Sequence, residues 1–221
     1  MEKLISLSNL FKDSFKIYKQ NFLVFVKLTS INFLAFLILL TLGVAFFLTK
    51  DNSYTSTILF FISTIFFLVA IFLMFWVQVS IIFTIKERDN RLSIKQILLK
   101  AWPYLGSFAW ISLLTSLAVL GGFILFIIPG IIFSVYFLFS KYVLFFEDKK
   151  GNLALIRSAQ LVQGNWWAVF GRFLLVGILA GIISYIPLLG SLINMFFTVP
   201  FVAIYICLMY EDLKRIKSIS N

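Results

Sequence analysis

The stretch Leu23–Leu48 reads LVFVKLTSINFLAFLILLTLGVAFFL and contains a single charged side chain, that of Lys27. A transmembrane helix needs about 20 consecutive, predominantly apolar residues, so this stretch is long enough to cross a bilayer. It does not alternate between apolar and polar residues as the strands of a membrane β-barrel do. The stretch therefore predicts a helix, which satisfies its backbone hydrogen bonds within itself.

Five more stretches along the chain have the same apolar character. We predict six transmembrane helices, at about 23–48, 57–85, 107–128, 131–146, 166–186 and 191–210. Pro129-Gly130 ends the third of these helices and Pro187 ends the fifth, while the short fourth helix contains Lys141. The predicted fold class is an all-α integral membrane protein in which residues 1–221 form a single transmembrane domain.

The composition excludes several classes of function. Hydrophobic residues make up 62% of the chain and charged residues 13%, whereas soluble domains are about 45–50% apolar and about 25% charged. With no His and one Cys, there is no basis for His-dependent acid–base chemistry, a His/Cys zinc site or an intrachain disulfide. No carboxylate lies in mid-span, and no phosphate-binding or dinucleotide motif occurs. The sequence therefore predicts no catalytic residues, no cofactor and no metal.

The basic residues, which give a net charge of +10, predict the orientation. They fall in four segments: Lys3, Lys12, Lys16 and Lys19; Lys86, Arg88, Arg91, Lys95 and Lys100; Lys149, Lys150 and Arg157; and Lys214, Arg215 and Lys217. The other side of the membrane carries Lys50 alone, next to Asp51. By the positive-inside rule, both termini are cytoplasmic. Anionic lipid headgroups, not nucleic acid, are then the expected partners of these charges.

An amphipathic segment precedes each odd-numbered span. The predicted apolar faces are Leu7, Phe11, Phe15, Tyr18 and Phe22; Ile94, Ile97, Leu98, Ala101 and Leu105; and Leu155, Ala159, Val162 and Trp166. Segments with this spacing form helices that lie in the headgroup plane. We interpret the chain as three repeat units, at about 1–85, 86–146 and 147–213, followed by a tail at 214–221. Each unit is an interfacial helix plus a helical hairpin. The alternative is that any membrane protein built of hairpins has spans flanked by aromatic residues.

One part of the sequence is similar to a known family. The similarity lies in five segments: Ile127–Phe133, Val143–Glu147, Ala154–Ser158, Leu161–Trp167 and Phe170-Gly171. The motif residues within them are Pro129, Gly130, Arg157, Ser158, Gly164, Asn165, Trp166 and Trp167. They resemble the membrane domain associated with glycerophosphoryl diester phosphodiesterases and related prokaryotic multi-pass proteins of unknown function. The resemblance implies a six-span module of a prokaryotic cytoplasmic membrane. It does not imply phosphodiesterase activity, because the hydrolase of that family is a separate soluble domain.

Lys27, Lys141 and Arg172 are the candidate binding residues, since each lies within a span near its cytoplasmic end. They are expected either to line a pocket for a phosphate-bearing headgroup or another anion, or to reach the interface or pair with Glu147 or Glu211. We expect Arg157 and Ser158 to bridge the neighbouring junctions. The remaining polar or small span residues are expected to pack helices: Gly177 and Gly181, within the chain or between subunits, and the amides of Asn32, Gln78 and Asn194.

These features favour a non-enzymatic membrane protein that binds or organises lipid, or that anchors a partner. A small permease or channel for an amphiphilic or anionic substrate is the alternative, and a continuous polar cavity would distinguish it. A third interpretation is a subunit of a larger complex, with another protein or further copies of the chain as partners.

Overall fold

The computed structural model describes residues 4–49, 53–90, 92–187 and 189–219, and within them every regular element is helical. The helices are α1 (Leu7–Gln20), α2 (Phe22–Leu48), α3 (Ser53–Lys86), α4 (Ile94–Ala101), α5 (Leu105–Leu125), α6 (Ile127–Tyr136), α7 (Ser140–Glu147), α8 (Asn152–Val162), α9 (Trp166–Ser184), α10 (Leu189–Ile193) and α11 (Val199–Ile219). A 3₁₀ turn, η1 (Trp102–Tyr104), precedes α5, and a π-helical turn, η2 (Asn194–Thr198), precedes α11.

Six helical stretches of the described chain are long and apolar enough to cross a membrane, as predicted. They are Phe22–Leu48, Tyr54–Lys86, Ile94–Leu125, Ile127–Glu147, Trp166–Ser184 and Leu189–Ile219. The charges at Lys3, Lys50, Asp51 and Arg91, on which the orientation prediction partly rests, lie outside the described residues. The chain therefore has the helices of a polytopic membrane protein.

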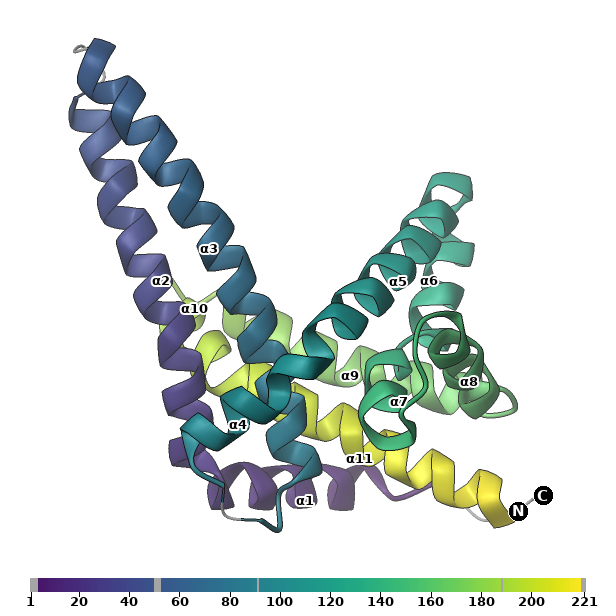
Figure 1. The fold of residues 1–221 in the computed structure, drawn as a ribbon. Coiled ribbons are helices and arrows are strands. Elements are labelled where there is room, and N and C mark those ends of the chain that lie inside the picture. The colour runs from purple at the N-terminus through teal and green to yellow at the C-terminus, as the bar shows by residue number, and fades with distance from the viewer. Residues whose placement is uncertain (1–3, 50–52, 91, 188, 220–221) are drawn as a thin grey trace.

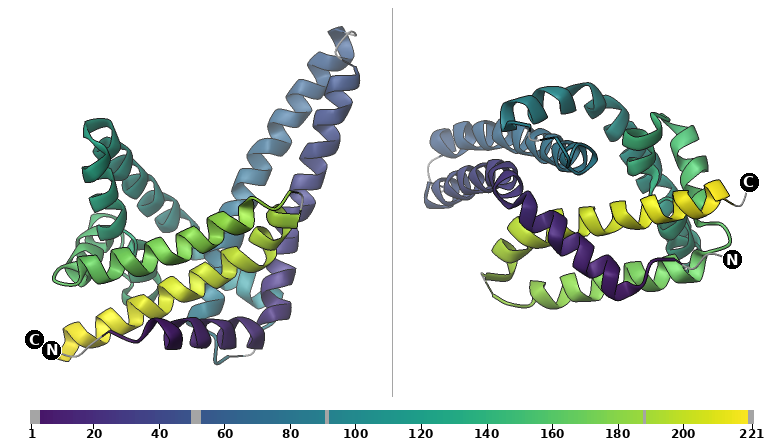
Figure 2. Two further views of the ribbon diagram at one scale, coloured as in Figure 1. Left: turned by 180° about the vertical axis from the view of Figure 1, so that it is seen from behind. Right: turned by 90° about the horizontal axis from the view of Figure 1, so that it is seen from below.

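The spans are arranged as a splayed assembly. Helices α2 and α3 run side by side, and α5 and α6 form a second pair that diverges from the first (Figure 1). Helices α9 and α11 cross beneath both pairs, and α1 lies along α11 (Figure 2). The buried core sits where the pairs converge, with Phe25, Phe108 and Tyr205 fully enclosed. The diverging ends of α2 and α3 instead expose apolar side chains, as a lipid-facing surface does.

The boundary between the third and fourth spans differs from the prediction. Helix α5 ends at Leu125, Phe126 takes an extended conformation, and α6 begins at Ile127, so Pro129 lies in the first turn of the next helix and does not end the previous one. Proline is tolerated there because the first-turn N–H groups of a helix have no intrahelical partner. The fourth span is itself divided, since α6 ends at Tyr136 and α7 begins at Ser140.

The last span is longer than predicted. The sequence prediction ended it at Tyr210, but α11 continues to Ile219. Tyr210, Asp212 and Leu213 are buried because α11 packs against α1 and α8 beyond its apolar part. Burial by neighbouring helices therefore extends this helix into a polar sequence, which hydropathy alone does not indicate.

The three segments predicted to be amphipathic are helices, and each buries only part of its predicted apolar face. In α1 the buried side chains are Leu10, Ser14 and Tyr18, whereas Leu7 and Phe15 are exposed. In α8 they are Ala154, Ser158, Leu161 and Val162. In α4 they are Ile97 and Ala101, both predicted. Tyr18 and Val162 were also predicted, whereas the buried Ser14 and Ser158 were not, because a count of apolar residues does not include serine.

Candidate functional site

Ser158 connects the two halves of the divided fourth span. Its side chain is fully buried, and its Oγ donates to the main-chain oxygen of Tyr136 at 2.6 Å and accepts from the N–H of Phe139 at 3.1 Å. These two backbone groups flank the break between α6 and α7. A buried backbone group without a partner is costly, so Ser158 provides at this break the hydrogen bonds that a continuous helix would make.

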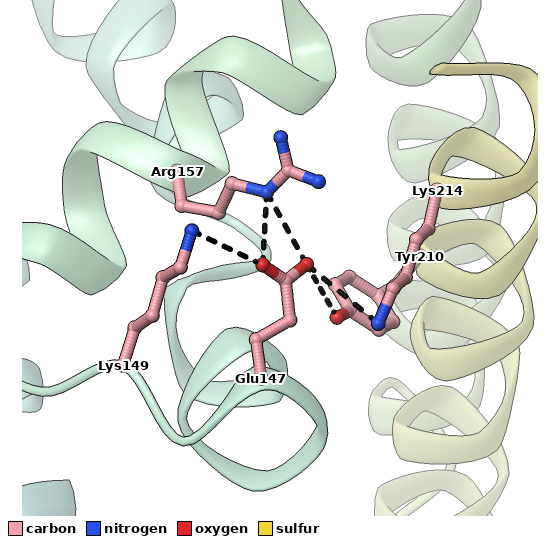
Figure 3. A network of polar contacts seen from close by, with 5 residues as sticks. All are labelled: Glu147, Lys149, Arg157, Tyr210 and Lys214. Carbon is pink, nitrogen blue, oxygen red and sulfur yellow. Dashed lines mark hydrogen bonds and ion pairs between the residues drawn. The ribbon is translucent and has the colours of Figure 1, made fainter. Parts of the chain in front are cut away.

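Glu147, the last residue of α7, is the centre of a polar network (Figure 3). The Nε of Arg157 in α8 donates to its carboxylate at 2.9 Å, and the hydroxyl of Tyr210 in α11 donates at 3.0 Å. The Nζ atoms of Lys149 and Lys214 lie 3.4 and 3.9 Å from the same carboxylate. One acidic side chain, only 10% exposed, thus connects α7, α8 and α11.

One alternative from the sequence paired the cations inside the spans with Glu147 or Glu211, and in the described chain neither acid forms an ion pair with them. Glu147 pairs with Arg157, and Glu211 pairs with Arg88 at 2.9 Å. Burial lowers the pKa of the Arg88 guanidinium, but the hydrogen bond and charge of Glu211 outweigh this and raise the pKa above its ordinary value. The sequence contained these acids and bases without indicating which of them meet.

Arg172 of α9 lies against the N-terminal segment. Its Nη2 donates to the main-chain oxygen of Ile5 at 2.8 Å, and its Nη1 donates to Ala168 at 3.3 Å. The N–H of Ile5 in turn donates to the buried carboxylate of Asp212 at 2.7 Å. Sequence reasoning missed Asp212 and Ile5, because nothing in the local pattern marks a partner so distant along the chain.

The remaining in-span cations lie in different surroundings. Lys27 is exposed on α2. The ammonium of Lys141, on α7, lies 4.9 Å from the centre of the Phe108 ring. Lys141 is also one of the residues that line a cavity of about 590 Å³. Neither Lys27 nor Arg172 lines this cavity, so the three cations do not converge on it. Among the described residues no carboxylate forms an ion pair with Lys141.

The cavity beside Lys141 lies between α3, α5, α6, α7, α9 and α11. Its polar lining consists of Gln78, Thr115, Ser134, Ser140, Lys141, Ser184, Asn194 and Thr198. The hydroxyls of Thr115 and Ser140 lie 3.2 Å apart, and Asn194 donates to Ser184 at 2.7 Å. Residues such as Val119, Val202 and Ile206 complete an apolar remainder. Such a site can hold a molecule that carries both an anionic group and hydrocarbon.

Thr198 adds a hydroxyl group whose hydrogen bonds are not satisfied. Thr198 is the last residue of the π-helical turn η2 and is 8% exposed. Its Oγ1 is buried and has no hydrogen-bond partner in the described chain. A π-helical turn inside a longer helix is often found at functional sites. Gln78 and Asn194, predicted to connect helices, both line this cavity, whereas Asn32 lies elsewhere with a buried, unpaired Oδ1.

Other residues of the family-like motif form the turn before α9. Gly164 has φ of 88°, a conformation that strongly favours glycine, and Asn165 donates its N–H to Val162 at 2.9 Å. The ring of Trp166 stacks on Phe170, while Trp167 is 78% exposed. Of the motif residues, Arg157 and Ser158 thus bridge helices, whereas Gly164 and Asn165 shape a turn.

The predicted close contact at Gly177 and Gly181 is absent within the described chain, because a Cβ at either position would meet nothing within 4 Å. The close helix contact is instead between α5 and α6. A Cβ on Gly122 would lie 2.9 Å from the Cα of Gly130 and 2.8 Å from the ring of Phe133. The spacing of glycines in one helix does not show which helix approaches it. A contact between subunits at Gly177 and Gly181 stays a prediction.

Comparisons of this chain with family models, with curated proteins and with solved structures find no match.

Proposed function

We propose that this chain is a non-enzymatic multi-pass protein of a prokaryotic cytoplasmic membrane that binds an amphiphile with an anionic group, such as an acidic lipid. The observation that carries the proposal is the position of Lys141. Lys141 lines an interhelical cavity, and no carboxylate of the described chain forms an ion pair with it. A cation inside a membrane domain is costly unless an opposite charge or water compensates it.

The dimensions and lining of the cavity support this proposal. Its volume of about 590 Å³ falls within the range of about 300–1,000 Å³ that is typical of small-molecule sites. The amide-bearing side chain of Gln78 lies in the lining, where a polar headgroup can meet it, and the apolar wall is available to hydrocarbon. A permease for the same amphiphile is the second candidate, and it is supported by the contribution of five predicted spans to the lining.

The rest of the proposal follows from the sequence. Both termini and the basic connections face the cytoplasm, and the chain consists of three units, each an interfacial helix and a hairpin. The resemblance to the membrane domain associated with glycerophosphoryl diester phosphodiesterases belongs to the same proposal. Anionic headgroups of the cytoplasmic leaflet are the expected partners of the basic residues of this chain.

The test is lipid retention by the full chain purified in a neutral detergent, measured by native mass spectrometry with added phosphatidylglycerol or phosphatidylcholine. The wild-type chain should retain phosphatidylglycerol in preference. Lys141→Ala should weaken that retention by about tenfold, the factor that corresponds to 1.4 kcal/mol, because one charged hydrogen bond is lost.

Lys27→Ala is the matched control, since it removes an exposed in-span lysine and should leave retention unchanged. Equal retention of phosphatidylglycerol by Lys141→Ala and the wild type would overturn the proposal. Lys141→Arg, which keeps the charge, should preserve most of the phosphatidylglycerol binding. That result would show that the weaker binding of Lys141→Ala comes from the lost charge and not from a folding defect.

A further inference from the structure

A second cavity, of about 550 Å³, lies between α1, α9 and α11, on the side of α9 and α11 that faces α1. Its lining is almost entirely apolar: Phe11, Phe15, Val176, Leu179, Ala180, Ile182, Ile183, Phe197, Phe201 and Val202, with Lys12 and Thr198 as the polar exceptions. We call it the α1 groove. Ala180, Thr198 and Val202 also line the Lys141 cavity, so these residues form a shared wall between the two.

Helix α1 is held firmly beside this groove. The hydroxyl of Tyr18 donates a hydrogen bond to the main-chain oxygen of Phe196 at 3.1 Å. The ring centroids of Phe11 and Tyr205 lie 5.1 Å apart. Leu10 and Ser14 are fully buried on the same face. The groove is therefore bounded by packed helices, and its shape does not depend on a mobile segment.

The opening of the groove is both apolar and positively charged. Phe15, which lines it, is 52% exposed, and Lys12 beside it is exposed as well. Lys16 and Lys19 continue the exposed basic face of α1, because residues three, four and seven positions apart lie on one side of a helix. Asp13 is exposed on the same helix, but no ion pair joins it to Lys12 among the described residues.

We propose that the α1 groove binds one acyl chain of an anionic phospholipid, whose phosphate lies at Lys12. An apolar cavity with a lysine at its opening matches the two parts of such a lipid, and a lysine can place its stem along hydrocarbon and its ammonium at the headgroup. The site needs only that the chain be embedded in a membrane. It does not depend on binding in the Lys141 cavity, since neither Lys12 nor Phe15 lines that cavity.

Photo-crosslinking to lipid tests this site in the full chain, reconstituted in vesicles of equal parts phosphatidylglycerol and phosphatidylcholine. Benzoylphenylalanine replaces Phe15 at the groove or, as the matched control, Phe36, which is 57% exposed on α2. The crosslinked lipids are identified by mass spectrometry. Phosphatidylglycerol should exceed phosphatidylcholine by about fivefold at position 15, as expected for one lysine at an anionic headgroup, and match the vesicle composition at position 36.

Four variants distinguish lipid binding in the groove from attraction to general surface charge and from binding in the Lys141 cavity. Lys12→Glu should abolish the enrichment of phosphatidylglycerol at position 15. Lys95→Glu, the same change at an exposed lysine of α4, should leave that enrichment unchanged. Leu179→Trp should fill the groove and reduce all lipid crosslinks at position 15, with thermal unfolding showing that the chain is folded. Lys141→Ala should leave this enrichment intact, so the experiment tests the α1 groove independently of the Lys141 cavity. Equal lipid ratios at positions 15 and 36, or enrichment that survives Lys12→Glu, would overturn the inference.

Discussion

The guanidinium of Arg172 donates a hydrogen bond at 2.8 Å to the main-chain oxygen of Ile5, 167 positions earlier in the chain. The N–H of the same Ile5 donates to Asp212 at 2.7 Å. One residue of the N-terminal segment thus joins α9 to α11. A cation that the sequence suggested as an anion ligand is engaged with the protein backbone.

Arg172→Ala should release the N-terminal segment from α9 and lower the free energy of unfolding by about 1.5–3 kcal/mol, the contribution of a hydrogen bond to a charged group. Unfolding by sodium dodecyl sulfate in mixed micelles, followed by circular dichroism, measures the change. Lys27→Ala serves as the control, because its exposed side chain should contribute less than about 0.5 kcal/mol. A loss of the same size in both variants would contradict a specific role for the bond to Ile5.

Ser158→Ala should cost about 1–3 kcal/mol of stability, because the buried N–H of Phe139 would lose its hydrogen-bond partner. The same unfolding measurement applies. Ser30→Ala is a suitable comparison, since the Ser30 hydroxyl donates only to Val26 within its own helix. If both serine variants unfold alike, the connection between α6 and α7 does not depend on Ser158.

The Glu147–Arg157 pair should be coupled more strongly than the Arg88–Glu211 pair. Glu147 is 10% exposed and Arg157 25%, against 28% and 32% for Arg88 and Glu211. Double-mutant cycles with alanine should give a coupling of about 1–3 kcal/mol for the first pair and about 0–1 kcal/mol for the second. A coupling near zero for Glu147–Arg157 would show that this ion pair does not connect α7 to α8.

Gly122→Ala and Gly121→Ala should change stability in opposite directions. A Cβ at position 122 would collide with Gly130 and Phe133, which should cost about 1–3 kcal/mol through overpacking. A Cβ at position 121 meets nothing within 4 Å. Gly121→Ala should therefore raise the free energy of unfolding by about 0.5–1 kcal/mol, because alanine loses less backbone entropy than glycine when the helix forms. Thermal unfolding of the two variants in detergent compares them directly, and equal midpoints would disprove the tight α5–α6 contact.

Cysteine labelling tests the proposed orientation. The native Cys207 is buried and should react little, so Tyr54→Cys and Ser218→Cys can be introduced singly. A membrane-impermeant maleimide added to spheroplasts should label position 54 at once and position 218 only after permeabilisation. Labelling of position 218 from outside would reverse the orientation and remove the cytoplasmic placement of the basic residues.

The spans were predicted well from sequence where a long apolar run decides the structure. Leu23–Leu48 is such a case, and α2 covers it. The prediction failed at Pro129, because a proline permits a helix to begin as well as to end. It failed again in α11, where packing and not hydropathy extends the helix to Ile219. Lys141 was a candidate from sequence, but the cavity it lines is assembled from residues far apart along the chain.

By itself, the sequence determined that this chain is helical and has six stretches suited to a bilayer, because each apolar run satisfies its backbone and avoids water without help from other segments. Tertiary structure alone decided which charges are paired within the protein and which one lines a cavity. Arg157, Arg172 and Lys141 are all cations that lie within helices. Their roles differ because other segments bring Glu147 to the first, Ile5 to the second and a polar cavity to the third.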